Sequence, residues 1–542
     1  MDVDRMQTKL ATWSQDLSWC SNDLYNLLYD REWLHRAYLT VKSNSGSRTA
    51  GVDGQTIQDF EEDLGGNLES LAKELKSQSY DPKPVRRTYI PKGDDEERPL
   101  GIPTIKDRIV QEALRMVLEP IWESNFSDRS FGFRPNRRTM DAINTTKMVI
   151  ATSLEARWVI DADVKGFFDN VDHGTLGKIL QDRITDRKML KLIWDFLKAG
   201  IMEDGTYRHS TLGTPQGGIV SPVLANIYLN RLDQWAKEWT DIPKGEKRKR
   251  RENGKGNWEF VRYADDFLFL TNGTKKRANR MKERIGDFVD EELNLTLSEK
   301  KTKIVHASDG FEFLGYNLQL TENGGARLTI PKEAEKELRR KVEQATDGGT
   351  EISVRRKIGG LNAILRGWAN YYKYANDSSD VLGSLDYFTW RQTADWLARK
   401  YKCSSKYLVE RKLESANPLR IKGQTLYTMA GDSDRYNEGM REKGHPYLRG
   451  SEIKRESFPN ADPGLANAER REGWRDARWE ALERDEWECQ ECGKNLGPGT
   501  AQVHHIRPYR GYDSTEEANR LENLKSLCPG CHKEIEGKRI CH

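Results

Sequence analysis

The stretch Tyr263-Ala264-Asp265-Asp266 lies between two short apolar runs, Phe260-Val261 and Phe267-Leu268-Phe269-Leu270. Two apolar runs around a short polar segment predict a β-hairpin with both carboxylates at or near its tip. Adjacent carboxylates at a strand end can hold Mg²⁺ against a substrate phosphate. Asp is also a common turn residue, so this stretch alone favours a solvated turn. The choice between the two interpretations depends on the rest of the chain.

A second strand signal that ends in acids lies upstream of the hairpin. The apolar residues 158–160 lead into Asp161 and Asp163, and a turn with Phe168 follows. One of these acids can join the two hairpin carboxylates across a sheet. Three carboxylates can bridge two Mg²⁺ ions, one that activates a primer 3′-hydroxyl and one that steadies the leaving pyrophosphate. Between the two acidic strands, the Gly/Pro-rich loop 213–222 either lets its backbone approach a nucleotide closely or is an ordinary turn before a helix.

The composition predicts three or four domains and a mild overall charge. The chain has 542 residues, and 88 Lys and Arg against 85 Asp and Glu give a net charge of +3. Any nucleic-acid surface must therefore come from local segregation of charge. Three stretches are densely basic, residues 244–255, 339–341 and 355–357, although each is also consistent with a solvated charged face.

The sequence predicts a cytoplasmic or nucleoid-associated protein of a bacterial or archaeal host. No apolar run is long enough to span a membrane, and the polar residues 1–16 fit neither a signal peptide nor a transit peptide. Five of the seven Cys lie near the C-terminus, four of them in pairs. In a cytosolic chain this spacing predicts a metal site instead of disulfides.

Helix signals dominate both ends of the first 404 residues. Residues up to about 80 are expected to be helical, residues 85–325 mix strand and helix signals, and Pro331 fits the first turn of another helix. A second helix and a third, at 385–400, should follow. Apolar residues at spacings of three and four define the core face of the second helix: Val354, Ile358, Leu361, Leu365, Trp368 and Tyr372.

Together these segments resemble the reverse transcriptases encoded by group II introns. The resemblance covers nearly the whole chain and combines the Tyr-Ala-Asp-Asp box, the box Pro215-Gln216-Gly217-Gly218, and Asp163 with an aromatic residue five positions later. Further matching motifs are Arg87 to Lys92, Arg98 to Pro103, Ser130 to Pro135, Lys300 to Lys303 and Gly310 to Tyr316.

The resemblance implies a multidomain α+β chain with a right-hand polymerase. Its expected parts are an N-terminal extension of the fingers (1–80), fingers and palm (81–325), an α-helical thumb or maturase domain X (326–404), a small DNA-binding region or linker (405–470), and an HNH endonuclease (471–542).

The resemblance also implies roles for residues of the polymerase site. The metal-binding catalytic triad would be Asp163, Asp265 and Asp266. Asp161 competes with Asp163, which we prefer because it stands five residues before Phe168.

Other residues would bind the nucleotide and the primer. Lys92 and Arg98 would clamp the incoming triphosphate, which suits their charge. Phe168 would exclude a ribose 2′-hydroxyl, Gln216 would sit under the templating pair, and Lys301 would approach the pyrophosphate. Phe313-Leu314-Gly315 would hold the primer end.

The C-terminal 72 residues combine two C-x-x-C knuckles with a His pair. The knuckles suit a tetrahedral structural zinc site, with Cys489, Cys492, Cys528 and Cys531 as ligands. The loop between them is long enough to hold structure of its own. It carries His504-His505 and Asn523, and His532 follows the last knuckle.

This unit resembles the HNH nuclease ββα-metal fold. The resemblance implies that His504 and His532 bind one divalent metal, Mg²⁺, that His505 is the general base, and that Asn523 orients the loop. The alternative is a zinc ribbon that only binds DNA. Cys541 and His542 have no expected role.

We therefore expect a multifunctional mobile-intron protein that is a reverse transcriptase, an RNA maturase and a DNA endonuclease. Its partners would be intron RNA in a ribonucleoprotein, double-stranded target DNA and dNTPs, with no membrane. Two alternatives are a host-domesticated reverse transcriptase without mobility and a splicing cofactor with an inactive polymerase.

Overall fold

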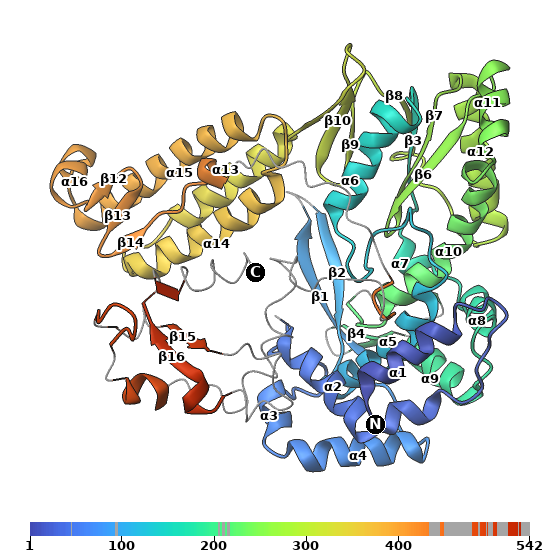
Figure 1. The fold of residues 1–542 in the computed structure, drawn as a ribbon, viewed down its shortest axis with the longest axis horizontal. Helices are drawn as coiled ribbons and strands as arrows, with labels where there is room; N and C mark the ends of the chain where they lie inside the picture. The colour runs from blue at the N-terminus through green and yellow to red at the C-terminus, as the bar shows by residue number, and fades with distance from the viewer. Residues whose placement is uncertain are drawn as a thin grey trace. The chain divides into compact units, whose positions relative to one another are not determined.

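The computed structural model of the chain forms two compact units, residues 1–452 and 453–542, and each is described by itself (Figure 1). It describes residues 1–44, 46–92, 96–203, 206–208, 212–213, 217–432, 445–448, 480–485, 488–494, 496, 502–506, 519–528 and 531–532. Within these residues, no helix combines the length and the apolar character that a bilayer crossing requires.

The N-terminal region is helical, as the sequence predicts. Its elements are α1 (Val3–Trp13), η1 (Tyr25–Tyr29), α2 (Arg31–Ser43), α3 (Ile57–Glu61) and α4 (Leu64–Lys76). The side chain of Asp30 caps α2 by accepting from the backbone N–H groups of Glu32 and Trp33. Both α1 and α2 pack on α5 (Ile105–Glu123), which is buried along almost its whole length.

Two sheets follow the helical region. The first has the order β2-β1-β4-β5, in which β1 pairs antiparallel with β2 and parallel with β4. Its strands are β1 (Val85–Lys92), β2 (Glu96–Ile102), β4 (Ile201–Glu203) and β5 (Thr206–Arg208). The second has the order β6-β7-β3-β8 and is antiparallel throughout. Its strands are β3 (Trp158–Asp163), β6 (Trp258–Tyr263), β7 (Asp266–Thr271) and β8 (Lys303–His306).

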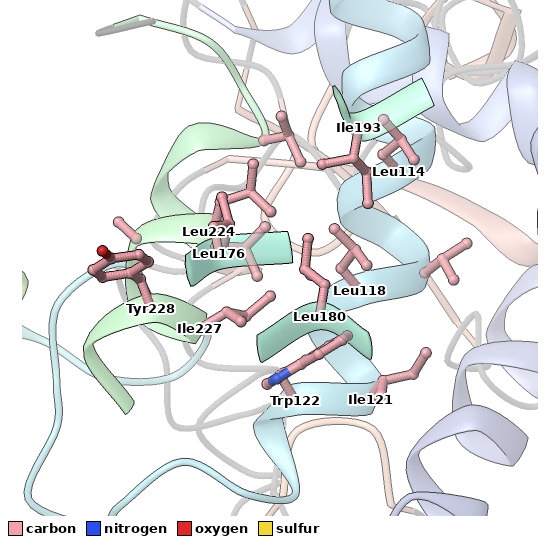
Figure 2. Packing of buried hydrophobic residues seen from close by; sticks show 14 of the residues in the cluster. Leu114, Leu118, Ile121, Trp122, Leu176, Leu180, Ile193, Leu224, Ile227 and Tyr228 are labelled. Carbon is pink, nitrogen blue, oxygen red and sulfur yellow. The ribbon is translucent and has the colours of Figure 1, made fainter. Parts of the chain in front are cut away.

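The second sheet has an apolar core on each face. Ile160, Phe267 and Phe269 belong to the larger core, which the helices on one side of the sheet complete. Figure 2 shows side chains from four of these helices interlocking in that core. The helices on this side are α5, α7 (Phe167–Asn170), α8 (His173–Gln181), α9 (Arg187–Lys198), α10 (Ser221–Thr240) and α12 (Lys275–Glu291).

The opposite face of the sheet belongs to a second core. Val159 and Leu268 point to this side, because side chains alternate along each strand. The core continues through α6 (Thr139–Met148) and the π-helix η2 (Val149–Ser153) into the small sheet β11-β10-β9. The strands of that sheet are β9 (Phe311–Phe313), β10 (Tyr316–Leu320) and β11 (Ala326–Thr329).

A helical bundle extends the second core (Figure 1). Its helices are α13 (Lys332–Thr346), α14 (Val354–Tyr372), α15 (Ser378–Tyr401) and α16 (Ser405–Arg411). The predicted apolar face of α14 is confirmed, because five of its six residues are buried and Trp368 is half-buried. Pro331 lies just before α13 as its N-cap, and the helix predicted for 385–400 is longer at both ends.

The chain beyond α16 forms more than an extended connection. Three short strands, β12 (Ser415–Ala416), β13 (Leu419–Ile421) and β14 (Gln424–Thr425), form a sheet, and β13 buries both its apolar side chains in the second core. Further on, the segment 445–448 contacts α5. His445 shares a hydrogen bond of 3.0 Å with the hydroxyl of Ser124, and the hydroxyl of Tyr447 donates to the Glu119 carboxylate.

The second compact unit holds a two-stranded sheet. β15 (Gln502–His505) pairs antiparallel with β16 (Leu524–Leu527), directly after the short helix η6 (Leu521–Asn523). Its small core contains Leu482, Cys489, Leu496 and Leu527. The long loop between the two knuckles therefore does hold structure, as expected.

Candidate active sites and metal centre

The predicted hairpin is present, and its turn carries the acids. Ala264 and Asp265 form the two-residue connection between β6 and β7, and Tyr263 pairs with Asp266 across the hairpin. Ala264 has a left-handed backbone, φ +56°, as tight hairpin turns require. On its other edge β7 pairs with β3, where Asp163 lies directly opposite Asp266. Cross-strand partners point to the same face, so these two carboxylates share one side of the sheet.

Asp161 lies on the same face, two residue pairs further from the turn. It stands opposite Leu268 on β7 and Lys303 on β8. Burial, followed by the neighbouring charge of Asp266, raises the pKa of Asp161 to about 6. Asp163 is thus the β3 carboxylate beside the turn, whereas Asp161 lies deeper along the sheet.

A lysine lies against Asp163. The ammonium of Lys301 donates to both carboxylate oxygens, at 3.1 and 3.2 Å. Its segment follows α12 and runs beside the end of β3, where the N–H of Ser298 donates to the carbonyl of Asp163 at 2.8 Å. The position next to Asp163 is therefore one that a cation can occupy.

Phe168 lies in α7, at the edge of the larger core. It makes edge contacts with Phe167 and Phe133, with ring centroids 5.3 and 6.4 Å apart. Phe133 is 49% exposed and has a positive φ of 56°. The loop before α10 also approaches α7, since a methyl group at Gly213 would lie 2.7 Å from the carbonyl of Phe168. Phe168 is therefore neither a fully buried core residue nor a free surface residue.

For three predicted nucleotide-binding residues, Lys92, Arg98 and Gln216, the structure describes the backbone of the first two only. Lys92 ends β1 and Arg98 lies in β2, opposite Ile90, but both side chains lie outside the described residues. Gln216 also lies outside the described residues. Its neighbour Gly217 has a φ of 111°, and a methyl group there would lie 2.3 Å from the carbonyl of Gly101 in β2.

A buried arginine that the sequence reasoning missed supports the acidic turn. Arg262 of β6 is fully buried and donates two hydrogen bonds of 2.6 Å to the carboxylate of Asp233 in α10. It also donates to Asn226 Oδ1 at 3.0 Å and to the carbonyl of Ala264 at 2.8 Å. The guanidinium thus ties the turn to α10. An Arg directly after the apolar pair Phe260-Val261, inside a strand, is the signal that would have pointed to this network.

A second support comes from the segment before α6. Phe131 N–H donates to the carbonyl of Arg262 at 2.9 Å, and the side chain of Asn226 donates to the carbonyl of Gly132 at 2.8 Å. A methyl group at Gly132 would lie 2.3 Å from the amide nitrogen of Ala264. Only glycine allows this approach, so the motif Ser130 to Pro135 packs directly behind the turn.

The predicted primer-end residues form the turn between β9 and β10. Leu314 and Gly315 both have positive φ. The hydroxyl of Tyr371 in α14 donates to the carbonyl of Leu314 at 2.7 Å, and Tyr316 donates to the carbonyl of Tyr371. The helical bundle therefore holds this turn through two tyrosines.

The four predicted zinc ligands come together in the second compact unit. The sulfur atoms of Cys489, Cys492, Cys528 and Cys531 all lie within 4.8 Å of one another. Thiolates that converge in this way suit one tetrahedral zinc ion, and they form the only such cluster of His, Cys and acidic residues found among the described residues.

Two of the predicted nuclease residues also face each other. His504 lies in β15 and His532 follows the second knuckle, and their rings are 5.1 Å apart and nearly perpendicular. Asn523 is buried at the end of η6, just before β16, and its carbonyl accepts from the N–H of Ile506 at 2.8 Å. The backbone of His505 belongs to β15, but its side chain is not among those described, and Cys541 and His542 lie outside the described residues.

Comparison with known families assigns three regions of the chain. Residues 90–318 match the family described as reverse transcriptase (RNA-dependent DNA polymerase), residues 335–413 the group II intron maturase-specific domain, and residues 489–538 the HNH endonuclease family.

Individual relatives agree with these regions. The group II intron-encoded protein LtrA of Lactococcus lactis subsp. cremoris is 31% identical, over 94% of this chain and 95% of its own length. Protein YkfC of Escherichia coli K12 is 40% identical, over 61% of this chain and 93% of its own length. With a reverse transcriptase, a maturase-specific and an HNH endonuclease domain in one polypeptide, the chain belongs to the family of group II intron-encoded proteins.

Proposed function

We propose that this protein inserts its intron RNA into DNA by target-primed reverse transcription. It would bind the intron RNA and assist its splicing, and the resulting ribonucleoprotein would insert the RNA into one DNA strand. The HNH domain would nick the opposite strand, and the new 3′-hydroxyl would prime cDNA synthesis. The observation that carries this proposal is the pairing of Asp163 with Asp266 beside the Asp265 turn, because a polymerase needs carboxylates converging on one point.

The polymerase site suits Mg²⁺. Asp163, Asp265 and Asp266 are the hard oxygen ligands that Mg²⁺ prefers, and the ammonium of Lys301 already occupies a cation position beside Asp163. When bound, Mg²⁺ would lower the pKa of the primer 3′-hydroxyl and neutralise charge on the leaving pyrophosphate. Lys301, whose side chain is more than half exposed, would turn from Asp163 toward that pyrophosphate.

The remaining site residues would bind and select the nucleotide. Lys92 and Arg98, on paired strands, would clamp the triphosphate. Phe168 would exclude a 2′-hydroxyl by its bulk, which is consistent with its half-buried position against Phe133. Gln216 would lie under the templating base pair.

The rest of the first compact unit would form the hand around this site. The fingers would comprise an N-terminal extension (1–80) and part of 81–325, and the palm would include β3, β6 and β7. Residues 326–404 would be the thumb and maturase domain X. The hydrogen bond from Tyr371 of α14 to Leu314 supports a thumb that steadies the primer end. Residues 405–470 would contribute to DNA binding.

In the HNH domain, zinc would be structural and a second metal catalytic. The converging thiolates of the two knuckles fit Zn²⁺, which would hold a unit too small for a large apolar core. His504 and His532 would hold a divalent ion, Mg²⁺, that stabilises charge on the phosphate. His505 would take the proton from the attacking water, and Asn523 would fix the loop between the strands.

Two variants test the nuclease independently of the polymerase. We would purify the protein with its co-expressed intron RNA and supply a plasmid that carries the joined exon sequences. His505→Ala should abolish nicking of the second strand, keep the unit resistant to protease, and leave extension of a supplied primer unchanged. Cys489→Ser should also abolish nicking, but by unfolding the unit, so that protease cleaves it.

The outcomes separate the alternatives. Equal protease sensitivity of both variants would make His505 a structural ligand. Normal nicking by His505→Ala would favour a plain DNA-binding zinc ribbon. A wild-type protein that extends primers but never nicks would point to a host-domesticated enzyme, and one that assists splicing without extending primers would be a splicing cofactor.

A further inference from the structure

Two short segments together carry a larger net positive charge than the whole chain. Residues 244–255 and 275–284 contain 13 Lys and Arg and three Glu among 22 residues, a formal charge of +10. The whole chain carries +3, so the other 520 residues sum to −7. The near-neutral total therefore hides one strongly basic region, which we call the basic surface.

The first segment forms a helix that adds nothing to the core. α11 (Lys244–Glu252) has no buried residue. Ion pairs along the helix support it, with Arg248 and Glu252 2.8 Å apart and Arg250 and Glu246 3.6 Å apart. A helix that is polar all round and ordered without burial does not stabilise the fold by packing. Its side chains are available for a partner.

The second segment lies beside the first. The side chain of Asn257 donates to the carbonyl of Lys247 in α11 at 3.0 Å, and its backbone N–H donates to Asn272 Oδ1 at 2.8 Å. A methyl group at Gly256 would lie 2.5 Å from the Cα of Gly273, just before α12. The end of α11 and the start of α12 therefore belong to one surface, at the right-hand edge of Figure 1.

Several cations on the basic surface have no acidic partner within the part of the chain that the structure describes. Four exposed side chains from the first segment form no ion pair with any acid among the described residues: Lys244, Lys249, Arg251 and Lys255. In α12, Lys275 packs over the ring of Trp158 and Arg284 over that of Trp239, at 5.3 and 4.9 Å. The exposed cations of the first segment are therefore able to meet an external polyanion.

The basic surface lies at the far end of the sheet from the acidic turn. α11 leads into β6 at Trp258, and α12 follows the end of β7 at Thr271, whereas the turn joins Tyr263 to Asp266. Five residues of strand separate the two ends, about 17 Å at roughly 3.3 Å per residue. A nucleic acid on this surface is therefore not the reacting end of the primer or the incoming nucleotide.

We propose that the basic surface binds the phosphate backbone of a folded RNA, separately from the template in the polymerase site. RNA is favoured over DNA because the surface belongs to the first compact unit, which also holds the reverse transcriptase and maturase matches. The inference rests on the proposed function only in naming that RNA as the intron. Lys and Arg side chains that bind phosphates release the counterions condensed on the RNA. The affinity of the protein for the RNA should therefore fall steeply as the salt concentration rises.

Neutralising the unpaired cations tests the proposal. The variant carries Lys244→Gln, Lys249→Gln, Arg251→Gln and Lys255→Gln, and its control carries four exposed lysines of α4, α8 and α9 changed in the same way: Lys76, Lys178, Lys188 and Lys198. Binding of a fluorescent 30-base-pair RNA duplex, and of DNA of the same sequence, is measured by anisotropy from 50 to 200 mM salt. The full-length protein is used throughout.

The variant should lose RNA affinity at least about tenfold, and its slope of log affinity against log salt should fall by up to about 3.6, since each of the four phosphate contacts contributes about 0.9. The control should keep at least half of the wild-type affinity. Equal losses in variant and control would overturn the proposal, as would unchanged RNA binding or a loss confined to DNA. Extension of a supplied primer on a short template should be normal in the variant. A wild-type protein that fails in extension would refute the polymerase function without touching this result.

Discussion

Replacing Arg262 by methionine should destabilise the protein strongly, and the damage should reach the acidic turn. The guanidinium is fully buried and makes the hydrogen bonds that hold Asp233, Asn226 and the carbonyl of Ala264. Methionine fills a similar volume but donates nothing. The carboxylate of Asp233, itself buried, is then left without its counter-charge.

The expected loss follows from the groups left without partners. Removing one member of a buried ion pair costs about 3–5 kcal/mol. The second variant, Arg262→Met with Asp233→Leu, removes the stranded charge. It should lose only about 1–3 kcal/mol, because Asn226 Oδ1 and the Ala264 carbonyl still lack a donor. The single variant should therefore be the less stable of the two by about 2 kcal/mol.

Urea unfolding measures the stability, and primer extension per folded molecule reports on the turn. Extension should stay at least about tenfold low in the double variant, because misplaced carboxylates that raise the activation free energy by about 1.4 kcal/mol already cost a factor of ten in rate. Arg183 is the control, because it is also buried but donates to residues 14–19 and Asn125 instead of the turn. Arg183→Met should lose stability at normal specific activity. A double variant that is less stable than the single, or fully active, would refute this account.

Phe168→Val should lower discrimination against ribonucleotides by roughly tenfold or more. The measure is the ratio of kcat/KM for a dNTP to kcat/KM for the matching rNTP. An unstable variant with unchanged discrimination would instead make Phe168 a core residue. The contact of the segment 445–448 with α5 should weaken in acid, because burial lowers the pKa of His445 to about 4. A folded pKa below the unfolded value of about 6.5 gives stability that is complete above pH 6.5 and is lost as pH falls toward 4. Hydrogen exchange of the Tyr447 and Leu448 amides, which both donate to His445, should show this loss, and His445→Gln should abolish the pH dependence.

Local patterns predicted the parts of the fold that depend on nearby residues. The hairpin at Tyr263 to Asp266 followed from two apolar runs around a short polar one, and α14 followed from apolar residues three and four apart. α14 buries one face and β7 buries both, and the spacing or the continuity of apolar residues reports that burial directly. The zinc ligands were predictable for a similar reason, because each C-x-x-C pair is fixed by local spacing.

Contacts between distant residues were not predictable. Arg262 meets Asp233 and Asn226 from another element, and nothing in the composition of β6 names those partners. Gly132 was part of a recognised motif, but its close approach to Ala264 depends on how the chain returns to the turn. The docking of His445 and Tyr447 on α5 joins residues more than 300 positions apart. Register across a sheet likewise decided that Asp163, and not Asp161, lies opposite Asp266.

Single-turnover extension of a DNA primer on an RNA template by Asp265→Asn tests the central claim most directly. The substitution keeps the size of the side chain and removes one charge that would hold Mg²⁺ at the turn. The account predicts that the rate falls by orders of magnitude, while urea unfolding, RNA binding and splicing assistance stay close to wild type. Extension at nearly the wild-type rate would contradict the assignment of Asp163, Asp265 and Asp266 as the metal-binding triad.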